Sequence, residues 1–341
     1  MDLYVASWEK SGGKTALCAG IGRSLKRSGI RVGYLSLACN GTGIDAWFMK
    51  TALGLDEPIE EIAPCSAGKS AGIAAGQLKA NVKEWREAVA KGKDVTLIEA
   101  AGALATDERA TEALVETVES LGARVIVVVN YAEKVQVDKI VAPLKKLGQN
   151  LLGVIVNRVP RNRMGIARAE IRDVLERQGL RVLCLVPEDR ILLGVTLAEL
   201  AERLQAERVC CADRLEQMVH NVMIGVMTPD SGSDYFIRKD HKAVIARGER
   251  PDMQLAALST PTAGLILTGG KGPIPQVKAW AEEKHVPILV TKADTLAAAS
   301  EVENAFVTAR FHHEAKLTRL EDILREDFDF STLRSGLGLT G

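Results

Sequence analysis

The sequence lacks the features that direct a chain to nucleic acid or to a membrane. Lys and Arg total 44, as do Asp and Glu, so the formal net charge is +0 and no overall field attracts a polyanion. Aromatic residues make up only 4% of the chain, and no basic run is interleaved with them. No apolar run approaches the ~18 residues that a membrane span needs, and a first strand predicted at residues 3–6 leaves no room for a signal peptide. We therefore expect a cytoplasmic protein that binds neither nucleic acid nor a membrane.

The cysteine spacing gives no sign of a zinc site or a disulfide framework. The chain has 6 cysteines, with no Cys-x-x-Cys pair and no histidine pair nearby at zinc-binding spacing. The adjacent pairs Cys210-Cys211 and His312-His313 are poor candidates for a metal or redox site, because neither pair has the spacing of metal ligands. We predict buried free thiols.

Apolar runs alternate with helix-patterned segments through the first part of the chain. The run at residues 125–129 is apolar without alternation, as expected of a strand that helices cover on both faces. Gly122, Gly148 and Gly179 follow helical segments and are typical helix stops. This pattern predicts a doubly wound α/β domain with a parallel sheet. Its strands are expected at residues 3–6, 31–38, 95–99, 125–129, 151–156 and 182–185, and helices at 111–121, 135–147 and 167–178.

The alternation weakens near residues 205–213, and a chain of 341 residues is long enough for two hydrophobic cores. We expect a first domain at residues 1–208 and a second, smaller α/β domain at residues 209–328. Residues 329–341 are rich in Gly, Ser and Thr, which predicts a mobile tail. The second domain is expected to have strands at 222–227, 243–246, 265–267 and 288–290, and helices at 251–258, 274–284 and 295–306.

A P-loop is the most informative feature of the chain. The first strand leads into Gly13-Lys14-Thr15 and a helix-like segment from Ala16. In such a loop backbone N–H groups surround phosphate oxygens, the lysine supplies a positive charge, and the threonine hydroxyl can hold Mg²⁺. Trp8 stands where the usual pattern has glycine, so we interpret the loop as a variant; an ordinary strand-to-helix turn is the alternative. The second such run, Gly68-Lys69-Ser70, follows no apolar strand and is interpreted as a helix start. The predicted ligand is a nucleoside triphosphate.

Polar residues at the carboxyl ends of the strands are the next candidates, because ligands of open parallel sheets bind at that edge. Glu99 ends the strand at 95–99 and would face the crevice of the P-loop. Magnesium prefers hard oxygen ligands, so Thr15, Glu99 and Asp45 make a chemically reasonable set; a solvated strand-end carboxylate is the alternative for Glu99. Asn157 follows the strand at 151–156, where its amide would read the edge of an adenine or would form a turn.

These features together resemble the dethiobiotin-synthetase-like branch of P-loop proteins, and more closely the N-terminal region of long phosphotransacetylases. The resemblance is carried by residues 4–15, Val32-Gly33-Tyr34, and residues 97–102, 153–160 and 186–190. The order and spacing of these segments are specific. Beyond them the chain resembles a DRTGG domain, in residues 242–245, 248–252, 254–258 and 265–270.

The resemblance implies an ATP and Mg²⁺ site in the first domain and a regulatory or dimerisation module in the second. Lys14 and Glu99 would be its catalytic residues, and Thr15, Glu99 and Asp45 would hold the metal. A homodimer and a second small-molecule ligand or interface are also implied, at Glu249, Arg250, Thr268, Gly269 and Gly270. The nucleotide-binding residues would be Lys10, Gly12, Gly13, Lys14, Thr15, Ala16, Asn157, Arg158, Pro187 and Glu188.

Three departures from the family pattern bear on catalysis. Ser36 stands in place of a lysine near the substrate loop, Ala100 in place of a glycine, and Glu249 in place of an aspartate. We also expect no phosphotransacetylase catalytic domain, and hence no acetyl transfer to coenzyme A. The leading hypothesis is a stand-alone Mg·ATP-binding regulatory or sensor protein. An ATP-dependent carboxylate–amine ligase or cyclo-ligase acting through an acyl phosphate, and a homologue that no longer binds nucleotide, are the alternatives, so the question of enzymatic activity stays open.

Overall fold

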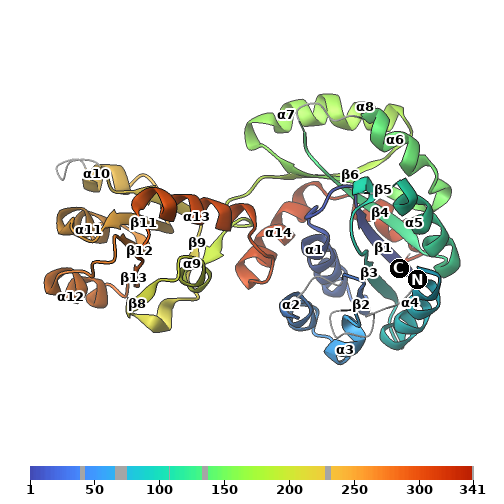
Figure 1. Cartoon of the computed structure of the whole chain (residues 1–341). Coiled ribbons are helices and arrows are strands. Elements are labelled where there is room, and N and C mark those ends of the chain that lie inside the picture. Colours follow the sequence, from blue (N-terminus) through green and yellow to red (C-terminus); the bar gives the residue numbers. More distant parts are fainter. Residues whose placement is uncertain (39–42, 66–74, 107, 133–136, 227–231, 340–341) are drawn as a thin grey trace. The chain divides into compact units, whose positions relative to one another are not determined.

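The computed structural model describes residues 1–38, 43–65, 75–106, 108–132, 137–226 and 232–339 (Figure 1). The chain forms two compact units. The first unit contains Met1–Asp189 and Phe311–Gly341, and the second contains Arg190–Arg310. These bounds differ from the division at residues 208 and 209 that the sequence predicts, because the chain leaves the first unit earlier and returns to it at Phe311.

The first unit is built on a six-stranded sheet with the order β2-β3-β1-β4-β5-β6, in which every neighbouring pair is parallel. The strand order reverses beside β1, which places the loop after β1 at a topological switch point. The doubly wound α/β fold expected from the sequence is confirmed. The strands are β1 (Asp2–Ser7), β2 (Val32–Ser36), β3 (Val95–Glu99), β4 (Arg124–Asn130), β5 (Leu151–Val159) and β6 (Val182–Pro187).

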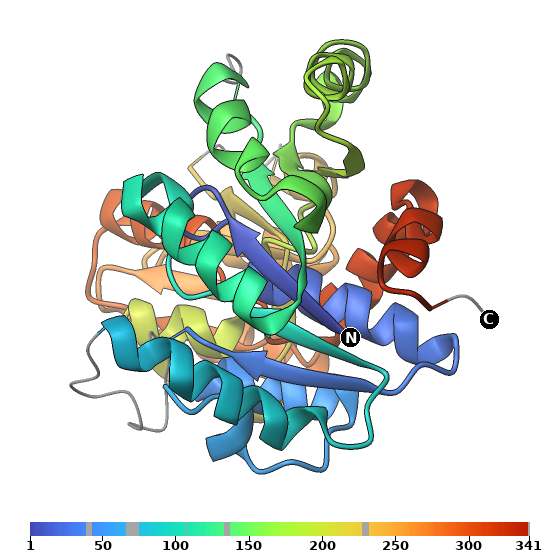
Figure 2. The same cartoon turned by 90° about the vertical axis from the view of Figure 1, so that its right-hand side faces the viewer.

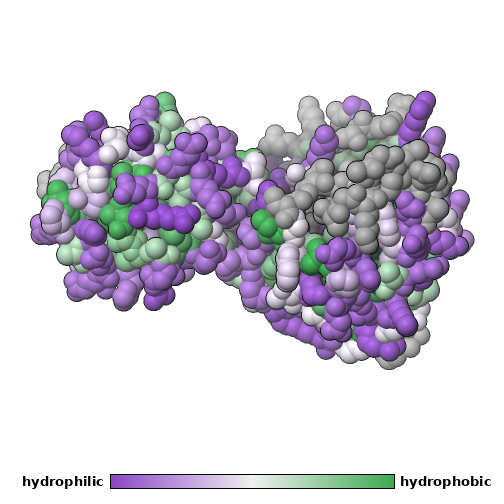
Figure 3. Space-filling view, turned by 60° about the horizontal axis from the view of Figure 1, so that its bottom comes forward, coloured by the Kyte–Doolittle hydropathy of each residue, from purple (hydrophilic) through white to green (hydrophobic). Residues whose placement is uncertain are grey.

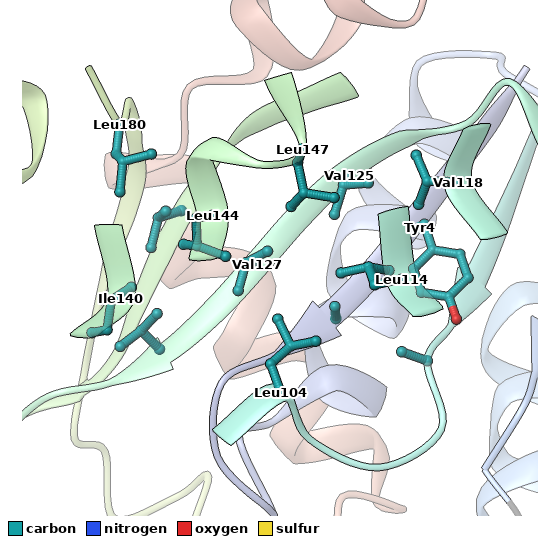
Figure 4. Packing of buried hydrophobic residues seen from close by; sticks show 14 of the residues in the cluster. Tyr4, Leu104, Leu114, Val118, Val125, Val127, Ile140, Leu144, Leu147 and Leu180 are labelled. Atoms are coloured by element: carbon teal, nitrogen blue, oxygen red, sulfur yellow. The ribbon is translucent and has the colours of Figure 1, made fainter. Parts of the chain in front are cut away.

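Helices cover both faces of this sheet (Figure 2). On one face α1 (Lys14–Arg27) packs against α14 (Glu314–Asp327), and α2 (Ile44–Leu53) packs against α1. The other face buries a cluster in which Tyr4, Val125 and Val127 of the strands meet Leu114 and other apolar side chains of the helices (Figure 4). The helices of this second face are α4 (Ala75–Ala90), α5 (Glu108–Leu121), α6 (Val137–Lys145) and α8 (Asp173–Arg177). Both faces of the sheet are therefore apolar, which explains the strands without alternation.

Short elements connect these layers. They are α3 (Ile59–Ile62), α7 (Met164–Ile166), a π-helix at Ala167–Arg172, and 3₁₀ turns at Leu104–Thr106, Gly148–Asn150 and Arg161–Arg163. The predicted helix at 167–178 is therefore a π-helix that continues into α8.

The C-terminal segment folds onto the first unit instead of forming the mobile tail that its composition predicts. A helix, α15 (Phe330–Gly336), begins at Asp329, whose carboxylate accepts a hydrogen bond from the backbone N–H of Thr332 at 2.9 Å. Leu333 and Leu337 are both 0% exposed. Two leucines at i and i+4 on one helix face supply the apolar surface that the Gly, Ser and Thr content conceals.

The second unit is a smaller α/β structure, as the sequence predicts, and its sheet lies between two layers of helices. Four parallel strands follow one another in the sheet, and β8 (Glu207–Cys210) pairs antiparallel with the last of them. These strands are β10 (Asn221–Ile224), β11 (Lys242–Arg247), β12 (Thr262–Thr268) and β13 (Ile288–Val290). One face carries α10 (Gly232–Phe236), α11 (Pro251–Leu258) and α12 (Pro275–Glu283), and the other carries α9 (Leu197–Arg203) and α13 (Thr295–Val307). A ribbon of β7 (Val195–Thr196) and β9 (Met218–Val219), and a 3₁₀ turn at Ala212–Arg214, complete the unit.

No helix in the described ranges has both the length and the apolar character needed to cross a bilayer. Of the cysteines in these ranges, Cys18, Cys65, Cys184 and Cys210 are buried and Cys211 is half-buried, and none of them forms a disulfide within the described structure. Cys39 and the run Gly68-Lys69-Ser70 lie outside the described residues.

Candidate nucleotide-binding site

The loop between β1 and α1 is shaped by two glycines that no larger residue could replace. Gly13 has φ +91°, and a Cβ atom there would lie 2.6 Å from Nδ2 of Asn157. A Cβ on Gly12 would lie 2.7 Å from Cβ of Ser7. Both distances are too short for a carbon atom, so neither position accommodates a side chain. Without side chains at these positions, a ligand can approach the backbone N–H groups of the turn closely.

The N-terminus of α1 is open to an anion. Gly13 is its N-cap, with no side-chain cap and no acidic residue in the first turn. The helix dipole and the unpaired N–H groups of the first turn, which includes Thr15 and Ala16, therefore favour a bound phosphate.

The ammonium group of Lys14 is held at this turn by one oxygen atom from the last residue of β1 and one from the loop after β3. It donates to Oγ of Ser7 at 3.0 Å and to the carbonyl of Gly102 at 2.7 Å. Burial lowers the pKa of Lys14, and the negative charge of Glu99 opposes that shift. Lys14 thus bridges the end of β1 and the loop after β3, where it would meet phosphate oxygens. Lys10, on the same loop, is exposed.

Glu99 is buried instead of solvated, with 4% of its surface exposed. Its Oε1 accepts a hydrogen bond from the Thr15 hydroxyl at 2.7 Å, and its Oε2 accepts one from the Tyr34 hydroxyl at 2.5 Å. Burial raises the pKa of Glu99, whereas the two hydrogen bonds and the charge of Lys14 lower it. The carboxylate faces the P-loop, as the sequence predicts, but it accepts hydrogen bonds from two hydroxyl groups of the protein where a solvated carboxylate would accept them from water.

The donor set around Glu99 has the chemistry that Mg²⁺ prefers. Thr15 and Glu99 offer hard oxygen atoms, and Asp45 in the first turn of α2 lies near enough for its charge to raise the pKa of Glu99 slightly. Over the part of the chain that the structure describes, no group of three His, Cys, Asp or Glu side chains is placed to hold a metal. A magnesium ion here would therefore take its remaining ligands from phosphate oxygens and water.

Asn157 and Arg158 hold the P-loop from the neighbouring end of β5. Nδ2 of Asn157 donates to the carbonyl of Gly12 at 2.9 Å, and its Oδ1 accepts from the N–H of Arg158 at 2.9 Å. Arg158 has φ +58°, and its guanidinium donates to the carbonyl of Ser11 at 3.4 Å. The Asn157 amide, for which the sequence suggests adenine recognition, is thus already bonded to the protein on both sides.

The end of β6 lies at the same edge of the sheet. Pro187 pairs with Val159 of β5, and the N–H of Glu188 donates to the Val159 carbonyl at 2.7 Å. The Glu188 side chain is exposed, as a residue bordering a base would be.

The next residue, Asp189, is buried and anchors this edge. Its carboxylate pairs with Arg161 and, at 2.9 Å, with Arg319 of α14. Asp189 is the last residue of the first unit before the chain enters the second unit. It is therefore bound to a helix, α14, that comes after the second unit in the sequence.

Sequence reasoning missed Tyr34 and Ser7 as parts of the site. Both belong to strands and are buried, so they have the pattern of core residues. The register of β2 beside β3, which pairs Ser36 with Glu99, brings the Tyr34 hydroxyl within reach of the carboxylate. The segment Val32-Gly33-Tyr34 contributed to the family resemblance, but no role followed from it.

The residues predicted for the second unit lie where β11 and β12 end. Glu249 accepts from Lys271 at 2.5 Å and pairs with Arg247 at 3.2 Å, while Arg250 pairs with Asp252 at 2.7 Å. All of these pairs lie at the ends of β11 and β12 or in the loops that follow these two strands.

The two loops touch through their backbones. A Cβ on Gly248 would lie 2.2 Å from the carbonyl oxygen of Lys271. Gly269 and Gly270 both have positive φ, of +82° and +71°, and the Thr268 hydroxyl lies 3.0 Å from that of Thr295. The predicted residues are therefore gathered at one edge of the second sheet.

A strand, a glycine turn, a lysine and a threonine that opens a helix, at the switch point of a parallel sheet, define a P-loop protein. The family model described as an AAA domain matches residues 1–196 of the 341, and the chain belongs to this family. The first region is a dethiobiotin-synthetase-like P-loop domain. The family model of the DRTGG domain matches residues 199–305. Both parts of the resemblance drawn from the sequence are thus confirmed.

Two solved structures are similar to parts of the chain. The first holds the CBS and DRTGG domains of the regulatory region of a Clostridium perfringens pyrophosphatase, complexed with the activator diadenosine tetraphosphate. It is 20% identical over 32% of this chain and 46% of that chain, with a TM-score of 0.29. The second is the MinD cell division protein of Aquifex aeolicus, 16% identical over 56% of this chain and 84% of that chain, with a TM-score of 0.39. This chain spans less than half of the first structure.

Proposed function

We propose that this chain binds Mg·ATP at its P-loop and acts as an ATP-dependent regulatory or sensor protein. The observation that carries the proposal is a contrast within one edge of the sheet. Thr15 is hydrogen-bonded to Glu99, and Lys14 lies close enough for its charge to lower the pKa of Glu99, which makes a set suited to phosphate and metal, whereas β2 ends in the uncharged Ser36. An acid substrate would lack the positive charge that a lysine supplies at that position.

Each residue of the set would have a distinct task. The N–H groups of the turn at Gly12 and Gly13 would bind phosphate oxygens, and the Lys14 ammonium would add a positive charge to them. Thr15 and Glu99, with Asp45 nearby, would hold Mg²⁺, which when bound neutralises charge on the phosphates. Pro187, Glu188, Asn157 and Arg158 would border the base.

A route for signalling follows from the position of Asp189. A base bound beside Glu188 would lie next to this buried carboxylate, and the chain enters the second unit at the following residue. Arg319, which pairs with Asp189, lies on the helix that follows the chain's return from the second unit. A nucleotide bound beside Glu188 would therefore affect both the segment that leads into the second unit and the helix that follows the chain's return from it.

Hydrogen–deuterium exchange with and without Mg·ATP tests the sensor proposal. A sensor predicts slower exchange at the P-loop and also a change within residues 190–310. Lys14→Ala should abolish both effects. Protection confined to residues 1–189 and 311–341 would contradict signalling to the second unit.

The ligase alternative predicts chemistry instead of signalling. The Lys14 charge and Mg²⁺ would stabilise a transferred phosphoryl group, and phosphate release would depend on an added dicarboxylate or diamine. Phosphate release assayed with such compounds separates the two functions. Release stimulated by an acid substrate would replace the regulatory proposal, and release that ignores every acid would favour it.

We also propose that the DRTGG domain provides a homodimer contact or a second ligand site at the edge marked by Glu249, Arg250, Thr268, Gly269 and Gly270. Large apolar side chains are exposed near that edge, among them Val226 after β10 (71%) and Leu296 after β13 (81%). Figure 3 shows hydrophobic residues set among hydrophilic ones on a face of this unit.

Light scattering of the full chain tests the homodimer. A dimer that Leu296→Asp dissociates is expected; a monomer at every concentration would contradict it.

A further inference from the structure

A cavity of about 540 Å³ opens at the amino end of β6 in the first unit. It lies between the start of this strand, the helix α8 and the junction of α14 with α15, with Arg172, Glu176, Arg181, Asp327 and Asp329 among its lining residues. The P-loop follows the carboxyl end of β1, which runs parallel to β6 through the sheet. The cavity is therefore at the opposite edge from the nucleotide site.

The size and polarity of this cavity suit a small polar ligand. Ligand pockets usually measure ~300–1,000 Å³. Most such pockets are largely apolar, whereas five of the residues that line this cavity are ionisable. A hydrophobic ligand would leave these charges without water, at a considerable cost.

The two aspartates are already engaged as structural groups. Asp327 accepts from the N–H of Leu185 at 2.9 Å and pairs with Arg172 at 3.3 Å and Arg168 at 3.5 Å. Asp329 accepts from Thr332 and Ser331 as the N-cap of α15. Their oxygen atoms therefore have little capacity for a ligand.

The arginines, in contrast, retain unused donors. Arg172 makes a single ion pair through Nη2, and its buried Nε has no hydrogen-bond partner among the described residues. Arg181 uses Nη1, which donates to Thr332 at 2.6 Å and pairs with Asp329 at 3.7 Å. A guanidinium has five N–H donors, so both side chains can still bind an oxyanion. The Arg172 Nε has almost no accessible surface, so the donors available to a ligand in the cavity are those of the terminal guanidinium nitrogens.

Arg172 is also the last residue of the π-helix at Ala167–Arg172. Such helices are rare, and they often occur at functional sites. In this one Arg168 and Arg172 both reach Asp327, so the π-helical turn carries the arginine that faces the cavity.

Glu176 supplies the remaining charge of the cavity. It is exposed, and its carboxylate forms no hydrogen bond or ion pair with the described residues. With two arginines and three acidic residues the lining has a formal charge of −1, which repels a polyphosphate. A ligand that carries one carboxylate and one ammonium group satisfies both the free arginine donors and Glu176.

We propose that this cavity binds a free α-amino acid, with its carboxylate on Arg172 and Arg181 and its ammonium group near Glu176. The proposal is independent of the nucleotide site, because none of these residues belongs to the P-loop edge. A ligand here would contact the segment around Asp327 and Asp329, which follows the chain's return to the first unit.

Thermal unfolding of the full chain with each proteinogenic α-amino acid at millimolar concentration tests the proposal. We expect at least one amino acid to raise the unfolding temperature in a saturable manner. Its N-acetyl derivative lacks the ammonium group and its amide lacks the carboxylate, so neither should bind. Glu176→Gln should weaken the affinity about tenfold or more, since it removes the partner of a charged group.

Arg177→Gln is the matched control, because Arg177 is on the same helix but pairs only with Asp173 in the described structure, at 3.9 Å, and does not line the cavity. It should leave the affinity unchanged, and Lys14→Ala should do so as well. A chain that no amino acid stabilises, or one that the N-acetyl or amide derivative stabilises equally, would overturn the proposal and leave a water-filled cleft.

Discussion

The Tyr34 hydroxyl is the clearest quantitative test of the Glu99 environment. Tyr34→Phe removes one oxygen atom and leaves Oε2 of a carboxylate that is 4% exposed without its donor. Hydrogen bonds to charged groups contribute about 1.5–3 kcal/mol, so we expect a loss of that size in the unfolding free energy of the first unit. Affinity for Mg²⁺ in the presence of ATP should also fall, because Glu99 loses the group that orients it.

Urea unfolding measured by tryptophan fluorescence is the assay. In a Trp280→Phe background the remaining tryptophans, at positions 8, 47 and 85, all belong to the first unit. Tyr4→Phe is the matched control, since Tyr4 is buried in the same unit and its hydroxyl has no hydrogen-bond partner among the described residues. The control should change stability by less than about 0.5 kcal/mol. Equal losses in the two variants would refute the assigned role of Tyr34.

Three further variants test other parts of the structure. Burial raises the pKa of Glu99 above its ordinary 4.5 in the folded state, so the stability linked to its proton is present below pH 4.5 and lost as the pH rises. Glu99→Gln should therefore stabilise the ligand-free unit by an amount that grows above this pH in the urea assay, and a pH-independent difference would contradict the assignment. Gly13→Ala should abolish ATP binding, because its Cβ would meet Asn157. It should also lower the unfolding free energy more than the control Gly29→Ala, since Gly29 has a similar φ of +80° but nothing within 4 Å of its Cβ position. Asp329→Ala removes the N-cap of α15 and should cost about 1 kcal/mol in the same assay; no loss would mean that the helix does not depend on its cap.

The parallel strands of both sheets could be predicted because each is a short, continuous apolar run, whereas the antiparallel β8, which contains Glu207 and Arg208, and the short β7 and β9 were not predicted. The strand expected at 95–99, for example, coincides with β3. The destination of α14 could not be predicted, although its leucines recur at helical spacing. Its position depends on a contact between distant segments, in which Gly20 of α1 leaves room for Leu320 and Leu324. Such a complementary surface has no signal in local sequence.

The candidate site was predictable where a charged or amide side chain stands near the carboxyl end of a strand, and hidden where a hydroxyl side chain belongs to an apolar run. Lys14, Thr15 and Glu99 could be named because parallel strands present their carboxyl ends at one edge. Tyr34 lies within the apolar run of β2, and only the register with β3 gives its hydroxyl a partner. Asn157 was identified by position, but its bond to the Gly12 carbonyl depends on how closely the two loops approach.

Calorimetric titration with ATP, with and without Mg²⁺, tests the central claim most directly. The account predicts magnesium-dependent binding that Lys14→Ala abolishes. Lys69→Ala, in the other Gly-Lys-Ser run, should leave the binding intact and serves as the matched control. Absence of binding by the wild-type chain, or binding that survives Lys14→Ala, would contradict the assignment of this loop as a nucleotide site.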